Sequence, residues 1–150
     1  MQTGLNRKKL VFPDETSAKT NMTRLYGHAP VGERLVDRTP HGHWVNVTHV
    51  CGLKRDGMVA PHAFAGAMNK KRFAEYLKRH LLPVLNKGDI VAMDNLSAHK
   101  GDDVEVLIGS AGAKVLYLPA YSPDLNPIEL SFSKLKSVLR KRKIRDVGKL

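Results

Sequence analysis

The stretch Asp89-Ile-Val-Ala-Met-Asp94 places a continuous apolar run between two aspartates. Such a run is typical of a strand that is covered on both faces of a sheet. Thirty-four residues separate Asp94 from Glu129, which lies in the segment Leu125-Asn-Pro-Ile-Glu129 (129 − 94 − 1 = 34). A carboxylate that ends a strand can meet one that opens a helix, and Asp14 upstream is a candidate third. Three such side chains would offer the oxygen ligands that hard divalent cations prefer.

The first half of the chain predicts three strands. The run Lys9–Phe12 is the first, and we expect it to end or bulge at Asp14, because Pro13 removes a donor from the hydrogen-bond ladder. The β-branched segment His43–Cys51 is the second. Arg55-Asp-Gly57 is typical of a hairpin turn that leads into the third strand. The residues between, 17 to 42, are rich in turn formers and predict an extended loop.

The second half predicts helices that alternate with strands. Asn69 can cap a helix whose apolar positions follow helical spacing, and a weaker helix spans about 102–110 before a strand at 114–118. Asn126 at the cap position and Pro127 after it predict the start of a last helix. The order of three strands, helix, strand, helix, strand, helix indicates an α/β protein with a mixed five-stranded sheet flanked by helices.

The charge of the chain favours a polyanionic partner, with nucleic acid as the leading candidate. The formal charge is +11, from 25 Lys and Arg against 14 Asp and Glu. Much of the excess lies near the C-terminus, where a solvated helix face is the ordinary alternative for any one residue. We take six of these cations as candidate DNA contacts: Lys134, Lys136, Arg140, Lys141, Arg142 and Lys143.

Cysteine content and hydropathy suggest the compartment. One cysteine, Cys51, excludes an internal disulfide framework and fits a reducing environment. No apolar stretch approaches the ~20 residues of a membrane span, and the first residues lack the apolar core of a signal peptide. We therefore expect a cytoplasmic protein without a membrane partner.

The three carboxylates predict a two-metal site. If the first strand and the strand ending at Met93 are parallel neighbours, Asp14 and Asp94 emerge side by side, and Glu129 crosses the same edge. In such sites one cation activates the attacking oxygen and the other stabilises the leaving oxygen, so no Ser, Cys or His nucleophile is expected. Alternatives remain for each: Glu129 as half of a capping box with Asn126, and Asp94 as a turn residue.

Three segments of the sequence resemble a known family. They are Asp14-Glu-Thr, Met93-Asp-Asn-Leu-Ser-Ala-His99 and Tyr117-Leu-Pro-Ala-Tyr-Ser-Pro-Asp-Leu-Asn-Pro-Ile-Glu129. Together they look like the catalytic core of mariner-type DDE transposases, in the bacterial insertion-sequence branch. The resemblance implies a ribonuclease-H-like fold, two Mg²⁺ or Mn²⁺ ions, nicking at transposon ends, and attack by the freed 3′-hydroxyl on target DNA, generally at TA.

Carried over position by position, the resemblance gives roles to residues. Asp14, Asp94 and Glu129 match the metal-binding and catalytic triad, and Asn95 and His99 match motif positions that orient the site or touch DNA. It also implies a division into a basic extension (1–8), a DDE catalytic core (9–143) and a basic tail (144–150).

Such transposases normally carry an N-terminal helix-turn-helix region, for which there is no room before Asp14. The chain is then the second reading frame of a split element, a truncated copy or an excised domain. The implied partners are double-stranded DNA, a second copy of the chain on that DNA, and a helix-turn-helix polypeptide from a separate frame. The implied location is the bacterial cytoplasm, at the nucleoid.

Other interpretations compete with this one. A zinc site from His41, His43, His49, Cys51 and His62 matches no established ligand spacing. Trp44 and Tyr121 are candidates for stacking on unpaired bases, although core packing is the more common role for a residue such as Trp44. The triad also fits another nuclease or integrase of the same fold, and the charge also fits an inactive DNA-binding remnant that regulates related elements.

Overall fold

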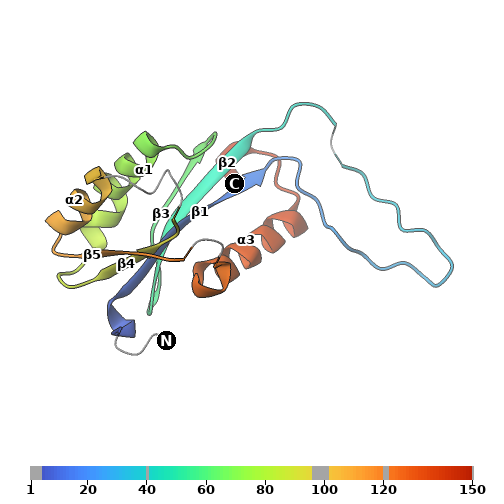
Figure 1. The fold of residues 1–150 in the computed structure, drawn as a ribbon. Coiled ribbons are helices and arrows are strands. Elements are labelled where there is room, and N and C mark those ends of the chain that lie inside the picture. Colours follow the sequence, from blue (N-terminus) through green and yellow to red (C-terminus); the bar gives the residue numbers. More distant parts are fainter. Residues whose placement is uncertain (1–4, 40, 96–101, 120–121, 150) are drawn as a thin grey trace.

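The computed structural model describes residues 5–39, 41–95, 102–119 and 122–149. Its centre is one five-stranded sheet with the order β3-β2-β1-β4-β5 (Figure 1). The strands are β1 (Leu10–Lys19), β2 (Asn46–Lys54), β3 (Gly57–Ala65), β4 (Ile90–Met93) and β5 (Lys114–Tyr117). The α-helices are α1 (Lys70–Tyr76), α2 (Asp102–Ser110) and α3 (Ile128–Arg142). Shorter helices are η1 (Arg7–Lys9), η2 (Leu77–Leu81), η3 (Leu82–Val84), η4 (Pro123–Leu125) and η5 (Val147–Lys149).

The ladders of the sheet follow from the connections between strands. β1, β2 and β3 form antiparallel pairs, and the β2–β3 hairpin turns at Arg55 and Asp56 before Gly57, whose φ of 136° favours glycine. β4 and β5 each follow a helix and pair in parallel, β4 with β1 and β5 with β4. The predicted mixed five-stranded α/β sheet and the predicted order of elements are confirmed.

The prediction for the first strand was wrong about where it ends. β1 does not stop at Asp14 but continues to Lys19, paired with β2 throughout its second half. Its parallel ladder with β4, in contrast, is formed at Leu10 and Val11 only. Pro13 lies two residues after Val11, and since it has no N–H to donate it suits a position where one ladder has ended while the other continues. The strand therefore carries Asp14 in its middle.

The helices divide between the two faces of the sheet. α1 and α2 lie together on one face, whereas α3 lies on the other (Figure 1). Side chains of α1, η2 and α2 pack with Val11, Val50 and Val91 in the main core. On the opposite face Ile128 and Phe132 of α3 pack against Cys51. The sheet is thus covered on both sides, and α3 alone covers the Cys51 side in the described part of the chain.

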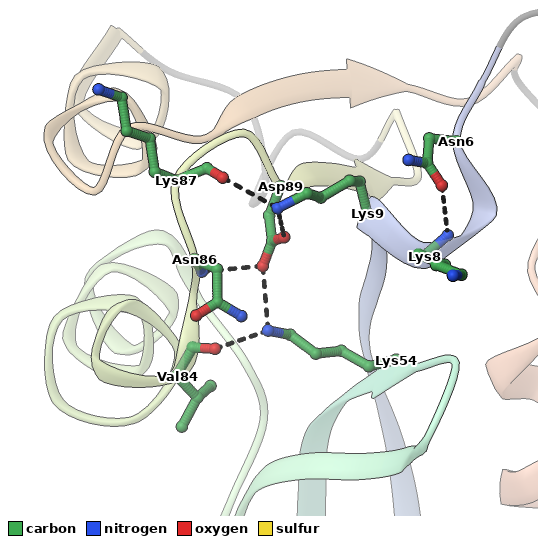
Figure 2. A network of polar contacts seen from close by, with 8 residues as sticks. All are labelled: Asn6, Lys8, Lys9, Lys54, Val84, Asn86, Lys87 and Asp89. Carbon is green, nitrogen blue, oxygen red and sulfur yellow. Dashed lines mark hydrogen bonds and ion pairs between the residues drawn. The ribbon is translucent and has the colours of Figure 1, made fainter.

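Asp89, at the start of β4, is a structural carboxylate. Its side chain is 3% exposed, and Figure 2 shows it between two lysines, Lys54 at 3.0 Å and Lys9 at 3.9 Å. The backbone N–H of Asn86 also donates to its Oδ2 (2.9 Å). Buried charges persist when they are paired and hydrogen-bonded in this way. Of the two aspartates that flank the β4 sequence, this one is used to anchor the strand.

A long loop, residues 20–45, joins β1 to β2 and extends away from the sheet (Figure 1). The C-terminal segment fixes it at two points. The Arg145 guanidinium donates from Nη1 to the carbonyls of Thr20 and Met22, both at 2.7 Å. Lys143 forms an ion pair with Asp37 (2.8 Å), which lowers the pKa of that carboxyl. The loop and the end of α3 therefore form one unit.

Searched over the residues that the structure describes, the helices include none with the length and apolar character needed to cross a membrane.

Candidate active site

Asp14 lies on β1, and Asp94 directly follows the neighbouring strand β4. β1 and β4 are parallel, and Leu10 pairs with Ile90, an offset of 80 residues. The paired residues end at Val11 and Val91, and the same offset continued by three residues places Asp94 level with Asp14 (94 − 14 = 80). The parallel arrangement that the sequence required for these two carboxylates is therefore present.

The Asp14 side chain points to the face that α3 covers. Asp14 pairs directly with Cys51, and side chains of directly paired residues share a face of the sheet. Cys51 packs against Ile128 and Phe132 of α3. Burial, and to a lesser extent the charge of Asp14, raise the pKa of the Cys51 thiol to about 11. This thiol is a packing group, in keeping with the expectation that no cysteine acts as nucleophile.

Asp14 is the most perturbed carboxylate of the described chain. Only 7% of the residue is exposed, and burial is the main cause that raises its pKa from 3.8 to about 7. A hydrogen bond from the Glu15 N–H to Oδ1 (2.8 Å) lowers it. The negative charges of Glu15, Asp94 and Glu129 then raise it, in that order. Asp94 and Glu129 therefore both act electrostatically on Asp14.

Asn126 contacts Asp14, although the sequence predicted that it would cap the last helix. Its Nδ2 donates to Oδ2 of Asp14 at 2.8 Å, a buried contact across 112 residues of sequence. The prediction that its side chain caps the last helix was wrong, because the N-cap position belongs to Pro127 and has no side-chain hydrogen bond. The capping box with Glu129 loses its Asn half for the same reason. Only the position of Asn126, three residues before Glu129, could have pointed to this role.

Glu129 lies in the first turn of α3 and is exposed. Carboxylates at this end of a helix are stabilised by its dipole. Asp14 is buried, Asp94 is half-buried and Glu129 is exposed, so solvent exposure increases across the three carboxylates in that order. Within the described residues no three Asp, Glu, His or Cys side chains come close enough together to hold one metal ion. Asp94 and Glu129 are near enough to Asp14 to affect its pKa, but the three carboxylates do not surround a single metal position.

The remaining predicted site residues fall into two groups. Asn95 directly follows Asp94 and is exposed, whereas His99 and Tyr121 lie outside the described residues. All six candidate DNA-contacting cations lie on α3 or directly after it. Arg140, Lys141 and Arg142 form its last turn, and Lys143 is the left-handed residue that ends it (φ 49°). Since Lys143 is paired with Asp37, its charge is already matched.

Two competing interpretations from the sequence can be compared with the structure. The set of His and Cys residues considered for zinc does not form a cluster of metal ligands in the described chain. His62 instead stacks on His80, with ring centroids 4.3 Å apart. Core packing of Trp44 was the wrong expectation, because half of this residue is exposed and the Lys19 ammonium lies 5.8 Å from its ring centroid.

Comparison with solved structures places this fold among known ones. The mariner Mos1 paired-end complex with Mg matches with a TM-score of 0.72 and 19% identity, over 93% of this chain and 44% of that chain. The Mos1 strand transfer complex matches with 0.70 and 20%, over 88% and 41%. The Mos1 transposase catalytic domain with raltegravir and Mg matches with 0.68 and 17%, over 96% and 67%. The chain spans less than half the length of the first two.

At these identities the likeness establishes the fold, which is the ribonuclease-H-like fold of the Mos1 catalytic domain. A comparison with curated proteins found no match. The profile of a family described as DDE superfamily endonuclease matches residues 9–150. Because this match covers nearly the whole sequence, the chain belongs to the DDE superfamily of endonucleases.

Proposed function

We propose that this chain is the catalytic domain of a mariner-type DDE transposase from a bacterial insertion sequence, which cleaves DNA at the transposon ends and joins them to target DNA. The observation that carries the proposal is the buried carboxylate of Asp14, level with Asp94 and electrostatically coupled to it and to Glu129. Strand cleavage by wild-type protein and by a triad variant in the presence of Mn²⁺ tests it.

The donor set fits a hard divalent cation. Three carboxylates bring only oxygen ligands and a charge of −3, the chemistry that Mg²⁺ and Mn²⁺ prefer. A buried carboxylate whose neighbours disfavour its ionisation is one that a cation would stabilise. Two bound ions would supply charge at the attacking and leaving oxygens of the phosphate. Structures of Mos1 have been solved with Mg and with Mn, which supports the same requirement here.

The protein's own residues provide position. Asp14 is held in the middle of a strand by the Glu15 N–H and the Asn126 amide, one donor on each oxygen. Glu129 follows Asn126 by less than one helical turn, so the same segment that holds Asp14 also places Glu129. Asp94 is half-buried and Glu129 is exposed, so a cation could reach both side chains from solvent. We infer that cation binding draws these two side chains toward the fixed Asp14.

Asn126 is then a positioning residue, and its replacement should weaken metal use. Asn126→Ala removes the donor to Oδ2 of Asp14, and removal of such supporting hydrogen bonds typically costs about 10- to 100-fold in metal affinity or activity. We expect the Mn²⁺ concentration for half-maximal cleavage to rise by that order. Asn126→Gln, which keeps the amide, should recover part of the loss. A uniform fall in rate at all Mn²⁺ concentrations would contradict the positioning role.

DNA is the proposed partner, and the basic end of α3 is the proposed contact. Mos1 has been solved in complexes with transposon ends, which supports a DNA substrate for this fold. Arg140, Lys141 and Arg142 should contribute most, because Lys143 is matched by Asp37.

The salt dependence of binding tests this surface. Replacing Arg140, Lys141 and Arg142 by alanine should reduce the slope of log K against log salt by about 2–3, near 0.9 for each phosphate that the protein no longer neutralises. Lys143→Ala serves as the matched control and should change the slope by much less than about 1, since its ammonium pairs with Asp37. Filter binding over a range of salt concentrations measures both. An unchanged slope in the triple variant would remove α3 from the DNA-binding surface.

The remaining partners are proposed from the family resemblance. The proposed partners are a helix-turn-helix polypeptide from a separate reading frame and a second copy of the chain on DNA. The proposed target is DNA with the dinucleotide TA, and the proposed location is the bacterial nucleoid. Support for the dimer comes from loop 20–45, where several large apolar side chains are exposed and available for burial, namely Leu25, Tyr26, Val31, Leu35 and Val36. Light scattering of the DNA complex measures the number of copies.

A further inference from the structure

Trp44, the one tryptophan of the chain, lies at the surface where loop 20–45 returns to β2. Half of the residue is exposed. Single exposed apolar side chains are common on protein surfaces, so exposure by itself implies nothing. The surroundings of this ring are more informative.

The ring lies in a cationic environment. The Lys19 ammonium is 5.8 Å from its centroid, within the range of a cation–π contact. A cavity of about 280 Å³ opens beside it. Among the described residues its walls carry imidazoles, a guanidinium and short polar side chains and no acid: Thr20, Asn21, His41, Gly42, His43, Trp44 and Arg145. An aromatic surface beside cations, without an acid, matches the chemistry of a nucleic-acid strand.

Hydrogen bonds fix the walls of this cavity. Val45, next to Trp44, exchanges two contacts with Thr20: its N–H donates to Oγ1, and its carbonyl accepts from the Thr20 N–H, both at 3.1 Å. Arg145 ties Thr20 and Met22 to the C-terminal segment. The backbone beside Trp44 is therefore held before any ligand arrives, which limits the entropy that binding would lose.

The cavity lies along the strand that carries the candidate active site. Thr20, which lines the cavity, follows Asp14 by six residues and lies one residue beyond the end of β1, a distance of about 20 Å at ~3.4 Å per residue. Phosphates of one DNA strand are also spaced by about 3.4 Å along a duplex. A strand whose phosphate lies at Asp14 could therefore reach Trp44 within a few nucleotides.

We propose that Trp44 stacks on an unpaired DNA base, with Lys19, His41 and His43 beside the adjoining phosphates. This inference rests on the proposed function for its substrate, DNA. The base must be unpaired, because a paired base offers the groove its edge and keeps its π-face inside the duplex stack. The pocket thus holds a single-stranded or frayed segment next to the site of cleavage.

The fluorescence of Trp44 reports on the pocket directly, since no other tryptophan contributes. We would titrate wild-type protein in EDTA with oligothymidine of about 12 nucleotides, a typical site size, and with a blunt duplex of the same length. Anisotropy of dye-labelled DNA gives the occupancy in each case. At equal occupancy, quenching is expected with the single strand and not with the duplex. Equal quenching by both, or none by the single strand, would overturn the proposal.

Variants test whether the Trp44 ring is responsible for binding single-stranded DNA. Trp44→Ala should weaken oligothymidine binding about 5- to 150-fold, whereas Trp44→Phe, which keeps an aromatic face, should stay within about threefold of wild type. Val106→Ala is the control, an exposed apolar side chain on α2, on the face of the sheet away from α3 (Figure 1), and it should change binding less than about twofold. Thermal melting checks the fold of each variant. An equal loss in the Val106 variant, or an unchanged Trp44→Ala, would reject the site.

Binding in EDTA separates this proposal from the proposed catalysis. Quenching by single-stranded DNA without Mn²⁺-dependent cleavage would reject the transposase activity of this chain and keep the pocket. Cleavage without quenching would reject the pocket and keep the activity. Absence of DNA binding at about 50 mM salt, where phosphate contacts are strong, would reject both.

Discussion

Asp94→Ala is expected to lower Mn²⁺-dependent DNA strand cleavage by more than about 100-fold, since even the groups that support metal ligands are worth about 10- to 100-fold. DNA binding should persist with its dependence on salt, because the phosphate contacts are assigned to the end of α3 and not to β4. A gel assay of nicked DNA measures the first quantity, and filter binding measures the second.

Asp89→Asn is the matched control for Asp94→Ala. Asp89 opens the same strand, but it is buried between Lys54 and Lys9 at the opposite end. Its replacement should lower the free energy of unfolding and leave cleavage by the folded fraction unchanged. If wild-type protein and Asp94→Ala bind DNA and are equally inert, the chain is a DNA-binding remnant. If both cleave equally, Asp94 has no role in metal binding.

Asp14→Asn should raise the stability of the metal-free protein at alkaline pH while it abolishes cleavage. The folded-state pKa of Asp14 is about 7 against 3.8 when unfolded, so the folded state holds this proton more tightly. Stability from this group is therefore greatest at low pH and falls as the pH rises from about 4 to 7. The difference of about three pKa units corresponds to at most roughly 4 kcal/mol.

Denaturant melts in EDTA at pH 5.5 and pH 8 measure this effect. The wild-type protein should lose stability across that interval, and Asp14→Asn should lose less. The variant can be accommodated, because a turn of the Asn126 amide would present its Oδ1, which is buried without a partner in the described structure, to the new amide. Mn²⁺ should stabilise the wild type and not the variant. A pH profile that the substitution leaves unchanged would contradict the assignment of this pKa to Asp14.

The sequence indicated the elements well, because their patterns are local. The apolar run of β4, the hairpin at Arg55 and Asp56, and the periodic face of α3 each depend on neighbours in the chain. The pairing of β1 with β4 entered only as the condition under which Asp14 and Asp94 would meet, and the structure shows that the two strands are parallel neighbours. The predictions were wrong at Pro13, at Trp44 and for the cap role of Asn126. Whether a strand continues past a proline, and whether an aromatic is covered, depends on partners distant in sequence.

The candidate site was predicted as a set of residue types and not as a geometry. Asp14, Asp94 and Glu129 could be chosen from motif spacing, and the structure brings them into electrostatic contact. Asn126 could not be assigned from sequence, since an Asn before a helix is usually its cap. Its true partner, Asp14, lies 112 residues away and is reached only when α3 packs on Cys51.

The sequence by itself determined the superfamily and the mixed five-stranded sheet, and it singled out three candidate carboxylates, because these follow from strings of residues and their spacing. The tertiary structure decided which side chains support them. Asp89 forms a buried ion pair with Lys54, and Lys143 forms an ion pair with Asp37. Asn126 donates a hydrogen bond to Asp14 and does not cap the last helix. Burial and charge pairing depend on what folding brings together, and for this reason the pKa of Asp14 and the exposure of Trp44 could be read only from the fold.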